Sequence, residues 1–195
     1  MITPEINSKS VDRLILGGET INCIDVILDY LNNPSQYFDQ FTLQTDEETL
    51  TKMYSDFYGD TMSQIILNCK STKIEVANDM GWGDFRILSY ILSRNDLKHR
   101  NIKFFEALRF SVATNLSISD CLAFLNICNY SLCFNRLRDR IIYIILSASS
   151  HHSKLEMDAR LDCLGALEDN EPWNTDDYDY FTLFSYVRRK REGVM

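Results

Sequence analysis

The chain contains little of what interrupts a fold or links it covalently. Only 3 of its 195 residues are proline and 7 are glycine, and no low-complexity stretch occurs, so we expect most of the chain to be ordered. Its 6 cysteines include no CxxC pair, and the close ligand pairs of a zinc site are therefore missing. We expect the cysteines to be reduced and to pack as small hydrophobic residues, without a bound metal or cofactor.

Long apolar runs and local catalytic motifs are missing as well. The longest apolar run, residues 141–146, is far shorter than the roughly 18 to 20 residues of a membrane helix. The N-terminus has no basic segment that leads into an apolar block, as a secretory signal would. No nucleophile elbow, phosphate loop or HExxH motif occurs, and we expect a cytoplasmic protein that is not an enzyme and has no membrane partner.

Net charge is uneven along the chain. The overall value is −8, but residues 61–150 contain eleven basic and seven acidic residues, a net of +4, between flanks of net −8 and −4. A basic segment of this kind is one footprint of a nucleic-acid-binding module. The excess is small for a dedicated DNA-binding domain, so charge alone does not decide the function.

Apolar residues recur at helical spacing along most of the chain, and no convincing alternating strand is present. Capping motifs such as Thr72-x-x-Glu75 mark several helix starts, and Gly59 suits a C-terminal helix exit. We predict helices over residues 20–31, 45–58, 62–69, 72–80, 84–93, 102–114, 117–126, 138–147 and 155–167. The predicted fold class is all-α, with an acidic N-terminal arm (1–58), a central domain (59–150) and a C-terminal extension (151–195).

The C-terminal segment 176–191 begins with acidic residues and ends with basic ones, which suits the dipole of a helix. The plainest interpretation is an amphipathic terminal helix docked on the protein. A dimerisation helix and a basic tail that touches nucleic acid are the alternatives.

The central domain carries a motif for two short helices joined by a tight turn. Ala77 is a small residue at the point where the helices meet, and Gly81 can adopt the left-handed conformation that the turn needs. Apolar residues that would hold both helices on a common core follow at matching offsets: Val76, Met80, Trp82, Ile87 and Tyr90.

This spacing resembles the repressor and Cro superfamily, often called the XRE family. The stretches 116–126, 129–132 and 138–142 are similar to a pattern that is common in Gram-positive members. The match covers residues 58–150 and implies a lambda-repressor-like helix-turn-helix bundle with extra N-terminal helices and a C-terminal helix. The alternative is another kind of helical bundle that places Ala77 and Gly81 at the same offsets.

In that family the second helix of the motif enters the major groove of DNA. The resemblance implies these DNA-binding candidates: Lys73, Asp84, Phe85, Arg86, Ser89, Arg94 and Lys98. Hydrogen bonding to base edges favours Arg, Lys, Asn or Gln. In this chain, the positions that contact bases in the family are occupied by acidic or apolar residues: Asp84, Phe85, Leu88 and Leu92. Cations around the motif suit phosphate contacts, which are independent of sequence.

This composition leaves two functions open. The first is a transcriptional regulator that binds DNA as a homodimer, because pseudo-palindromic sites need two-fold pairing. The second is a module that keeps the scaffold and binds a protein partner through exposed apolar residues, namely Phe85, Leu88 and Leu92. In a third interpretation, other parts of the chain cover Leu88 and Leu92, so that both are buried and neither contacts a partner. The resemblance and the central charge place DNA-associated regulation first.

Overall fold

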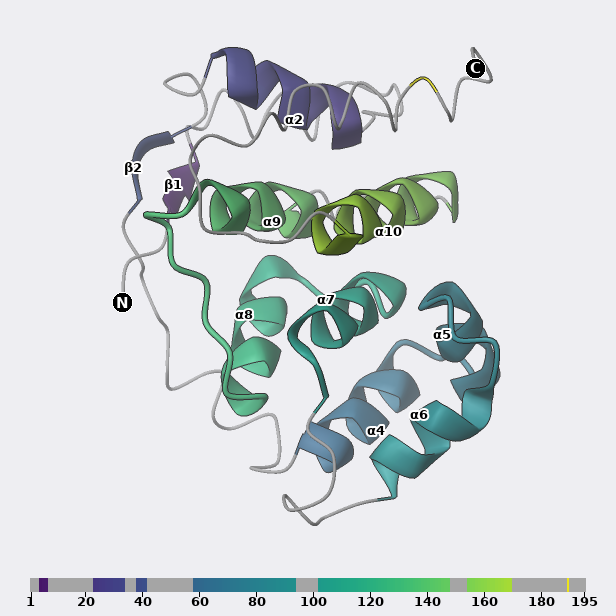
Figure 1. The fold of residues 1–195 in the computed structure, drawn as a ribbon. Helices are drawn as coiled ribbons and strands as arrows, with labels where there is room; N and C mark the ends of the chain where they lie inside the picture. The colour runs from purple at the N-terminus through teal and green to yellow at the C-terminus, as the bar shows by residue number, and fades with distance from the viewer. Residues whose placement is uncertain are drawn as a thin grey trace. The chain divides into compact units, whose positions relative to one another are not determined.

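The computed structural model describes residues 4–6, 23–33, 38–41, 58–93, 102–147, 154–169 and 189. These residues form eight α-helices and one short two-stranded ribbon (Figure 1), so the all-α prediction is confirmed in outline. Residues 45–57 of the predicted helix over 45–58, the joint 94–100 with Arg94 and Lys98, and all of 176–191 except Arg189 lie outside the described residues. The chain divides into two compact units, each considered by itself below: Asp46–Ser131, and Met1–Thr45 together with Leu132–Met195.

The unit Asp46–Ser131, called the central unit, contains five described helices. They are α4 (Tyr58–Asn68), α5 (Lys73–Asp79), α6 (Phe85–Leu92), α7 (Phe104–Ala113) and α8 (Ile118–Ile127). Helix α6 packs on α4 and α5, while α7 packs on α5 and α8, and α8 also meets α4. The rings of Phe110 and Phe124 lie 5.2 Å apart in the core between α7 and α8, where both side chains are fully buried.

Helix starts in the central unit follow the predicted capping chemistry. The Thr72 hydroxyl accepts the Glu75 N–H at 3.2 Å, and the Glu75 carboxylate accepts the Thr72 N–H at 2.7 Å. Ser117 caps α8 in the same way, by accepting the Asp120 N–H at 3.2 Å. Each cap satisfies amides that the first turn of a helix leaves without an internal partner.

Three helices of the central unit end in one recurring turn. After α5, Gly81 has φ +76, its N–H donates to Asn78 O at 2.9 Å, and the Trp82 N–H donates to Ala77 O at 2.9 Å. This is the Schellman arrangement, in which a left-handed residue closes the helix. Helices α7 and α8 end alike, with Asn115 and Asn129 in the left-handed position. The predicted role of Gly81 is therefore confirmed.

The predicted helix exit at Gly59 is wrong. Gly59 lies in the first turn of α4 and is buried there. Its carbonyl accepts the Ser63 hydroxyl at 2.9 Å. The helix continues through this glycine because Tyr58, Met62 and Ile65 keep an apolar side at helical spacing, and all three are buried.

The other unit, called the flanking unit, contains three described helices and the ribbon. Helices α2 (Cys23–Asn32), α9 (Leu137–Ser147) and α10 (Lys154–Asp169) all pack on one another. Strands β1 (Pro4–Ile6) and β2 (Phe38–Phe41) pair antiparallel, and neither strand was predicted. Helix α9 falls in the expected central domain 59–150, yet it belongs to the three-helix packing of this unit.

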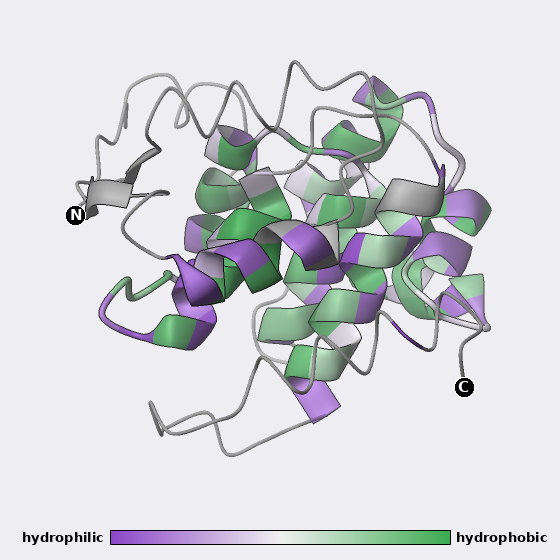
Figure 2. Cartoon of the chain, turned by 90° about the horizontal axis from the view of Figure 1, so that it is seen from above, coloured by the Kyte–Doolittle hydropathy of each residue, from purple (hydrophilic) through white to green (hydrophobic). Residues whose placement is uncertain are grey.

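Helix α9 is buried on nearly all sides, from Ile141 to Leu146. Its C-terminal carbonyls are satisfied by Arg160 of α10, which is 2% exposed and donates to Ile145 O at 2.8 Å and Leu146 O at 3.2 Å. A cation at this end also matches the helix dipole. Hydropathy colouring shows hydrophobic and hydrophilic residues alternating around many of the helices (Figure 2).

Candidate nucleic-acid interface

Helix α6 sits in a different rotational register from the one expected. Leu88, Ile91 and Leu92 are 0%, 2% and 7% exposed, and they face α4 and α5, the helices on which α6 packs. Their spacing of three and four residues places them on one side of the helix. Leu88 and Leu92 are therefore core residues, and the prediction that they form part of an exposed partner-binding or base-reading face is wrong.

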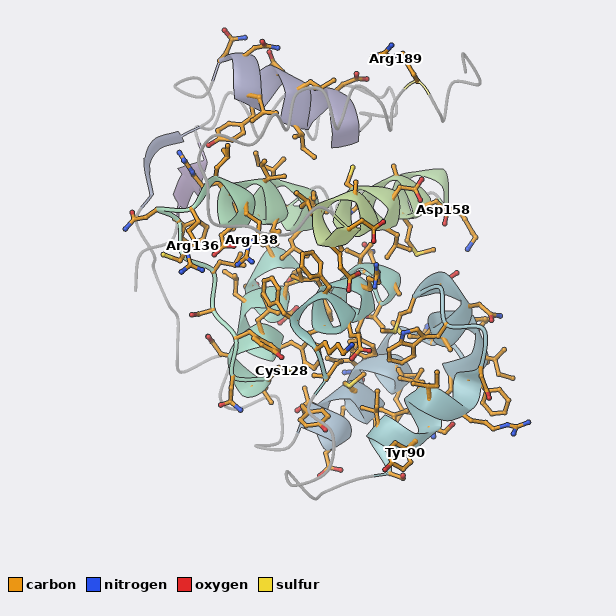
Figure 3. All side chains as sticks on the ribbon, in the orientation of Figure 1. Tyr90, Cys128, Arg136, Arg138, Asp158 and Arg189 are labelled. Carbon is orange, nitrogen blue, oxygen red and sulfur yellow. The ribbon has the colours of Figure 1, made fainter. Side chains whose placement is uncertain are left out.

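The opposite side of α6 is correspondingly richer in polar groups. Each residue turns the helix by about 100°, so a core side centred on Leu88, Ile91 and Leu92 turns Arg86 and Tyr90 outward, with Ser89 beside them. The Arg86 side chain is 83% exposed, Ser89 is half-buried, and Tyr90 is 43% exposed. Tyr90, predicted to lie in the core, instead reaches the surface at the later end of α6 (Figure 3).

Asp84 acts as the N-cap of α6. Its carboxylate accepts the Arg86 N–H at 2.9 Å, and the same oxygen lies 3.6 Å from Arg86 Nε. One acidic side chain thus caps the helix and partly offsets the charge of the neighbouring guanidinium. Its side chain is still 51% exposed, so it would also oppose a phosphate brought close to the start of α6.

Phe85 begins α6 and is 44% exposed. Directly before it, the segment at Gly83 is open, because a Cβ placed there would meet no atom within 4 Å. Phe85 lies in the sequence between Asp84, whose carboxylate caps α6, and the exposed Arg86. Phe85 remains a candidate contact, as predicted from its position.

Helix α5 contributes a cation and an apolar side chain to the exposed surface. Lys73 is exposed at the start of the helix, next to the Thr72–Glu75 cap. Hydrogen bonds from the Thr72 backbone and then from its hydroxyl lower the pKa of the Glu75 carboxyl. Ile74 is 52% exposed, since Val76 and Ala77 occupy the buried side of α5.

Two exposed apolar residues, Leu67 and Ile74, do not figure among the sequence candidates. Leu67 is 76% exposed near the end of α4, where the apolar run Ile65-Ile66-Leu67 suggests burial of all three. Only Ile65 and Ile66 are buried. The signal that separates them is the helical period from Met62, which leaves Leu67 on the outer side.

Reactive groups elsewhere are used for structure. Asp139 is 1% exposed and accepts the Cys133 N–H at 2.7 Å and Arg138 Nε at 2.6 Å. Figure 3 shows Arg136 and Arg138 at the start of α9. Burial raises the pKa of the Cys128 thiol to about 12, which keeps it protonated at neutral pH. Within the described residues, no group of three or more His, Cys, Asp or Glu is placed to hold a metal ion.

No helix in the described part of the chain has the length and apolar character needed to cross a bilayer. The exposed polar groups of α6, together with Lys73 at the start of α5, form the candidate interface of the central unit. In comparisons with known proteins, no family model, no curated protein and no solved structure matches this chain.

Proposed function

We propose that the central unit is a helix-turn-helix domain of the lambda-repressor type, and that it contacts duplex DNA through α5 and α6 as part of a regulatory protein. Three features support the domain type. Two short helices are joined by the left-handed turn at Gly81. Val76 and Ala77 are fully buried where these helices meet. Helix α4 precedes the pair, and α7 and α8 follow it.

The observation that carries the DNA proposal is the rotational register of α6. With Leu88 and Leu92 in the core, the polar groups that reach the surface of α6 are the Arg86 guanidinium, the Tyr90 phenol and the hydroxyl of the half-buried Ser89. Arginine is the commonest donor to guanine O6 and N7 in the major groove, and hydroxyls serve bases and phosphates alike. The observed register thus removes Leu88 and Leu92 from the mismatch between an apolar helix and base reading, while Asp84 and Phe85 stay exposed at the start of α6.

Phosphate contact is assigned to Lys73 and Arg86. Each cation that neutralises a phosphate releases a condensed counterion, so the binding constant falls as salt rises. The family resemblance adds that the regulator acts as a homodimer on two half-sites about one helical turn apart. Sedimentation of the protein with and without duplex DNA tests that addition separately.

The proposal is tested by fluorescence anisotropy on a random-sequence 24-base-pair duplex across a salt series. We expect binding at low salt, with log K falling linearly against log [salt]. Lys73→Ala and Arg86→Ala should each lower the slope by about 1. Lys154→Ala, which removes another exposed lysine, at the start of α10, is the matched control and should leave the slope unchanged. Absence of binding at low salt would overturn the proposal.

Substitutions of Asp84 test independently whether DNA approaches the start of α6. Asn is as good an N-cap as Asp, so Asp84→Asn keeps the cap of α6 while removing the negative charge. We expect the variant to bind duplex DNA more tightly than wild type at low salt with unchanged stability. Asp84→Ala should lose about 1 kcal/mol of stability. Equal or weaker DNA binding by Asp84→Asn would argue that DNA does not approach the start of α6.

The second candidate function is a protein-interaction module. It now rests on the exposed apolar side chains Phe85, Ile74 and Leu67 instead of on Leu88 and Leu92. Exposed apolar side chains that gather into a patch commonly mark partner sites. Two results together would favour this alternative. The protein would bind no duplex at any salt concentration, and the variants Ile74→Ser and Leu67→Ser would fold normally but lose self-association or partner binding.

A further inference from the structure

The connection between α4 and α5 presents two exposed aliphatic side chains and two lysines. Leu67 is 76% exposed near the end of α4, and Ile74 is 52% exposed in the first turn of α5. Lys70 and Lys73 lie between them in the sequence and are exposed as well. These four residues are called the α4–α5 corner. A span of seven residues cannot exceed about 25 Å, so one short ligand can reach all four side chains.

The two lysines of the α4–α5 corner are not neutralised by a neighbouring acid. Among the described residues, none has a carboxylate that pairs with either ammonium. Glu75 is the acidic residue nearest in sequence, and its carboxylate accepts the Thr72 N–H at 2.7 Å and the Thr72 hydroxyl at 2.8 Å in the cap of α5. By contrast, the Arg86 guanidinium lies beside the Asp84 carboxylate. The corner therefore offers positive charge to an external anion.

Lys70 has a backbone conformation that lysine rarely adopts. Its φ is +57, in the left-handed region, just after the end of α4. Three other helices of the central unit also end with a left-handed residue, and there it is glycine or asparagine: Gly81, Asn115 and Asn129. Those two types accept the conformation at lower cost than residues with a longer side chain. A lysine that persists in this conformation points to a role for its side chain.

We propose that the α4–α5 corner binds an acidic peptide segment of a partner protein, in which Asp or Glu is interspersed with aliphatic residues. The lysines pair with its carboxylates, which sets the sign of the partner's charge. Its aliphatic side chains cover Leu67 and Ile74 and remove them from water. This interaction goes beyond DNA contact through α6 and does not depend on it.

Two other anionic partners match the α4–α5 corner less well. A DNA backbone supplies phosphates to the lysines but little apolar surface to cover Leu67 and Ile74. An anionic bilayer supplies both, yet a helix that lies in a membrane interface buries an extended apolar face. Helix α5 has only seven residues, and Val76 and Ala77 on its apolar side are buried in the core. An acidic peptide with apolar side chains is therefore the best match.

The test measures fluorescence anisotropy of three labelled peptides of 16 residues, each about 24 Å long when helical. The first has Glu and Leu at helical spacing, the second has Gln in place of every Glu, and the third has Ser in place of every Leu. DNA is left out, because Lys73 is shared with the proposed DNA contact. At low salt, wild-type protein should bind the first peptide about tenfold more tightly than either of the others.

Substitutions in the protein assign the contacts. Leu67→Ser and Ile74→Ser should each weaken binding of the first peptide about fivefold, because apolar contact is lost. Lys73→Gln should weaken it about threefold and narrow the difference between the Glu and Gln peptides. Lys103→Gln, which removes another exposed lysine of the central unit, just before α7, is the matched control and should bind as wild type does. Circular dichroism confirms that each variant is folded.

Lys70→Gly separates binding from folding. Glycine adopts the left-handed conformation without steric cost, so the urea midpoint of the variant should rise. Its affinity for the first peptide should fall about threefold, because a cation is lost. A lysine with a purely structural role would not change stability and affinity in opposite directions.

Four results would overturn the proposal. They are failure to bind the first peptide, equal binding of all three peptides, unchanged affinity in Lys70→Gly, and a loss of affinity in Lys103→Gln as large as in Lys73→Gln. Vesicles of phosphatidylserine and phosphatidylcholine form a separate arm. Vesicle binding that is lost in Leu67→Ser, without peptide binding, would assign the corner to a membrane surface and would overturn the proposal as well. Duplex binding is measured separately in the salt series, so failure here leaves the DNA proposal standing.

Discussion

The register of α6 is the structural fact on which the proposed interface depends, and the pair Leu88 and Tyr90 tests it. Leu88 is 0% exposed and Tyr90 is 43% exposed, although only one residue, Ser89, separates them. Truncating a fully buried leucine to alanine costs about 2–5 kcal/mol, because transfer energy is lost and a cavity forms. Surface truncation costs about 0.5 kcal/mol or less. We therefore expect Leu88→Ala to destabilise the central unit by about 3 kcal/mol and Tyr90→Ala to change it little.

The assay is urea unfolding followed by Trp82 fluorescence. The chain has 2 tryptophans, so a Trp173→Phe background leaves Trp82, in the turn before α6, as the reporter of this unit. With a slope of about 1.5 kcal/mol/M, the Leu88→Ala midpoint should fall by about 2 M. The interpretation is refuted if Tyr90→Ala costs as much as Leu88→Ala, or if Leu88→Ala is neutral.

Three further predictions concern the turn, a cap and the thiols. Gly81→Ala should cost about 1–2 kcal/mol from its left-handed φ of +76 alone, whereas Gly83→Ala should be neutral or slightly stabilising by urea unfolding. The pKa of Glu75 is lowered in the folded state. The ionised carboxylate therefore contributes to folding stability above about pH 4.3, and this contribution is lost as pH falls through the pKa of the folded state. The stability difference between wild type and Glu75→Gln should therefore shrink as pH falls below about 4.3. At pH 8, iodoacetamide followed by peptide mass mapping should modify exposed Cys133 and spare buried Cys128, whose pKa is about 12.

Local features of the central unit were predictable because their chemistry is local. The Thr72 and Ser117 caps and the left-handed Gly81 each follow from residues three or four positions apart. The hydrogen bonds that they make span one helical turn. A short stretch of sequence contains everything that decides them.

The register of α6 was not predictable in the same way. Six of the eight residues in FRILSYIL are apolar, so several helix sides look equally suited to burial. The choice is made by α4 and α5, which cover the side with Leu88 and Leu92. Tyr90 adds to the ambiguity, because a phenol suits both a core edge and a wet surface.

The placement of α9 and the ribbon depends on contacts between distant parts of the chain. Helix α9 is buried from Ile141 to Leu146, and a helix without a polar side gives no sign of which neighbours cover it. Its partners are α2 and α10, and α2 is more than 100 residues earlier. The pairing of β1 with β2 is likewise non-local, and strands of three and four residues are too short for a visible alternation.

The most direct test of the interface is a map of which amides respond to DNA. Titration of 15N-labelled protein with a random-sequence duplex at low salt should shift the amide resonances of Lys73, Phe85, Arg86 and Ser89. Amides of α10, such as Cys163, should not move. Shifts confined to residues outside α5 and α6, or no shifts at all at saturating duplex, would contradict the account of α6 as the DNA-facing helix.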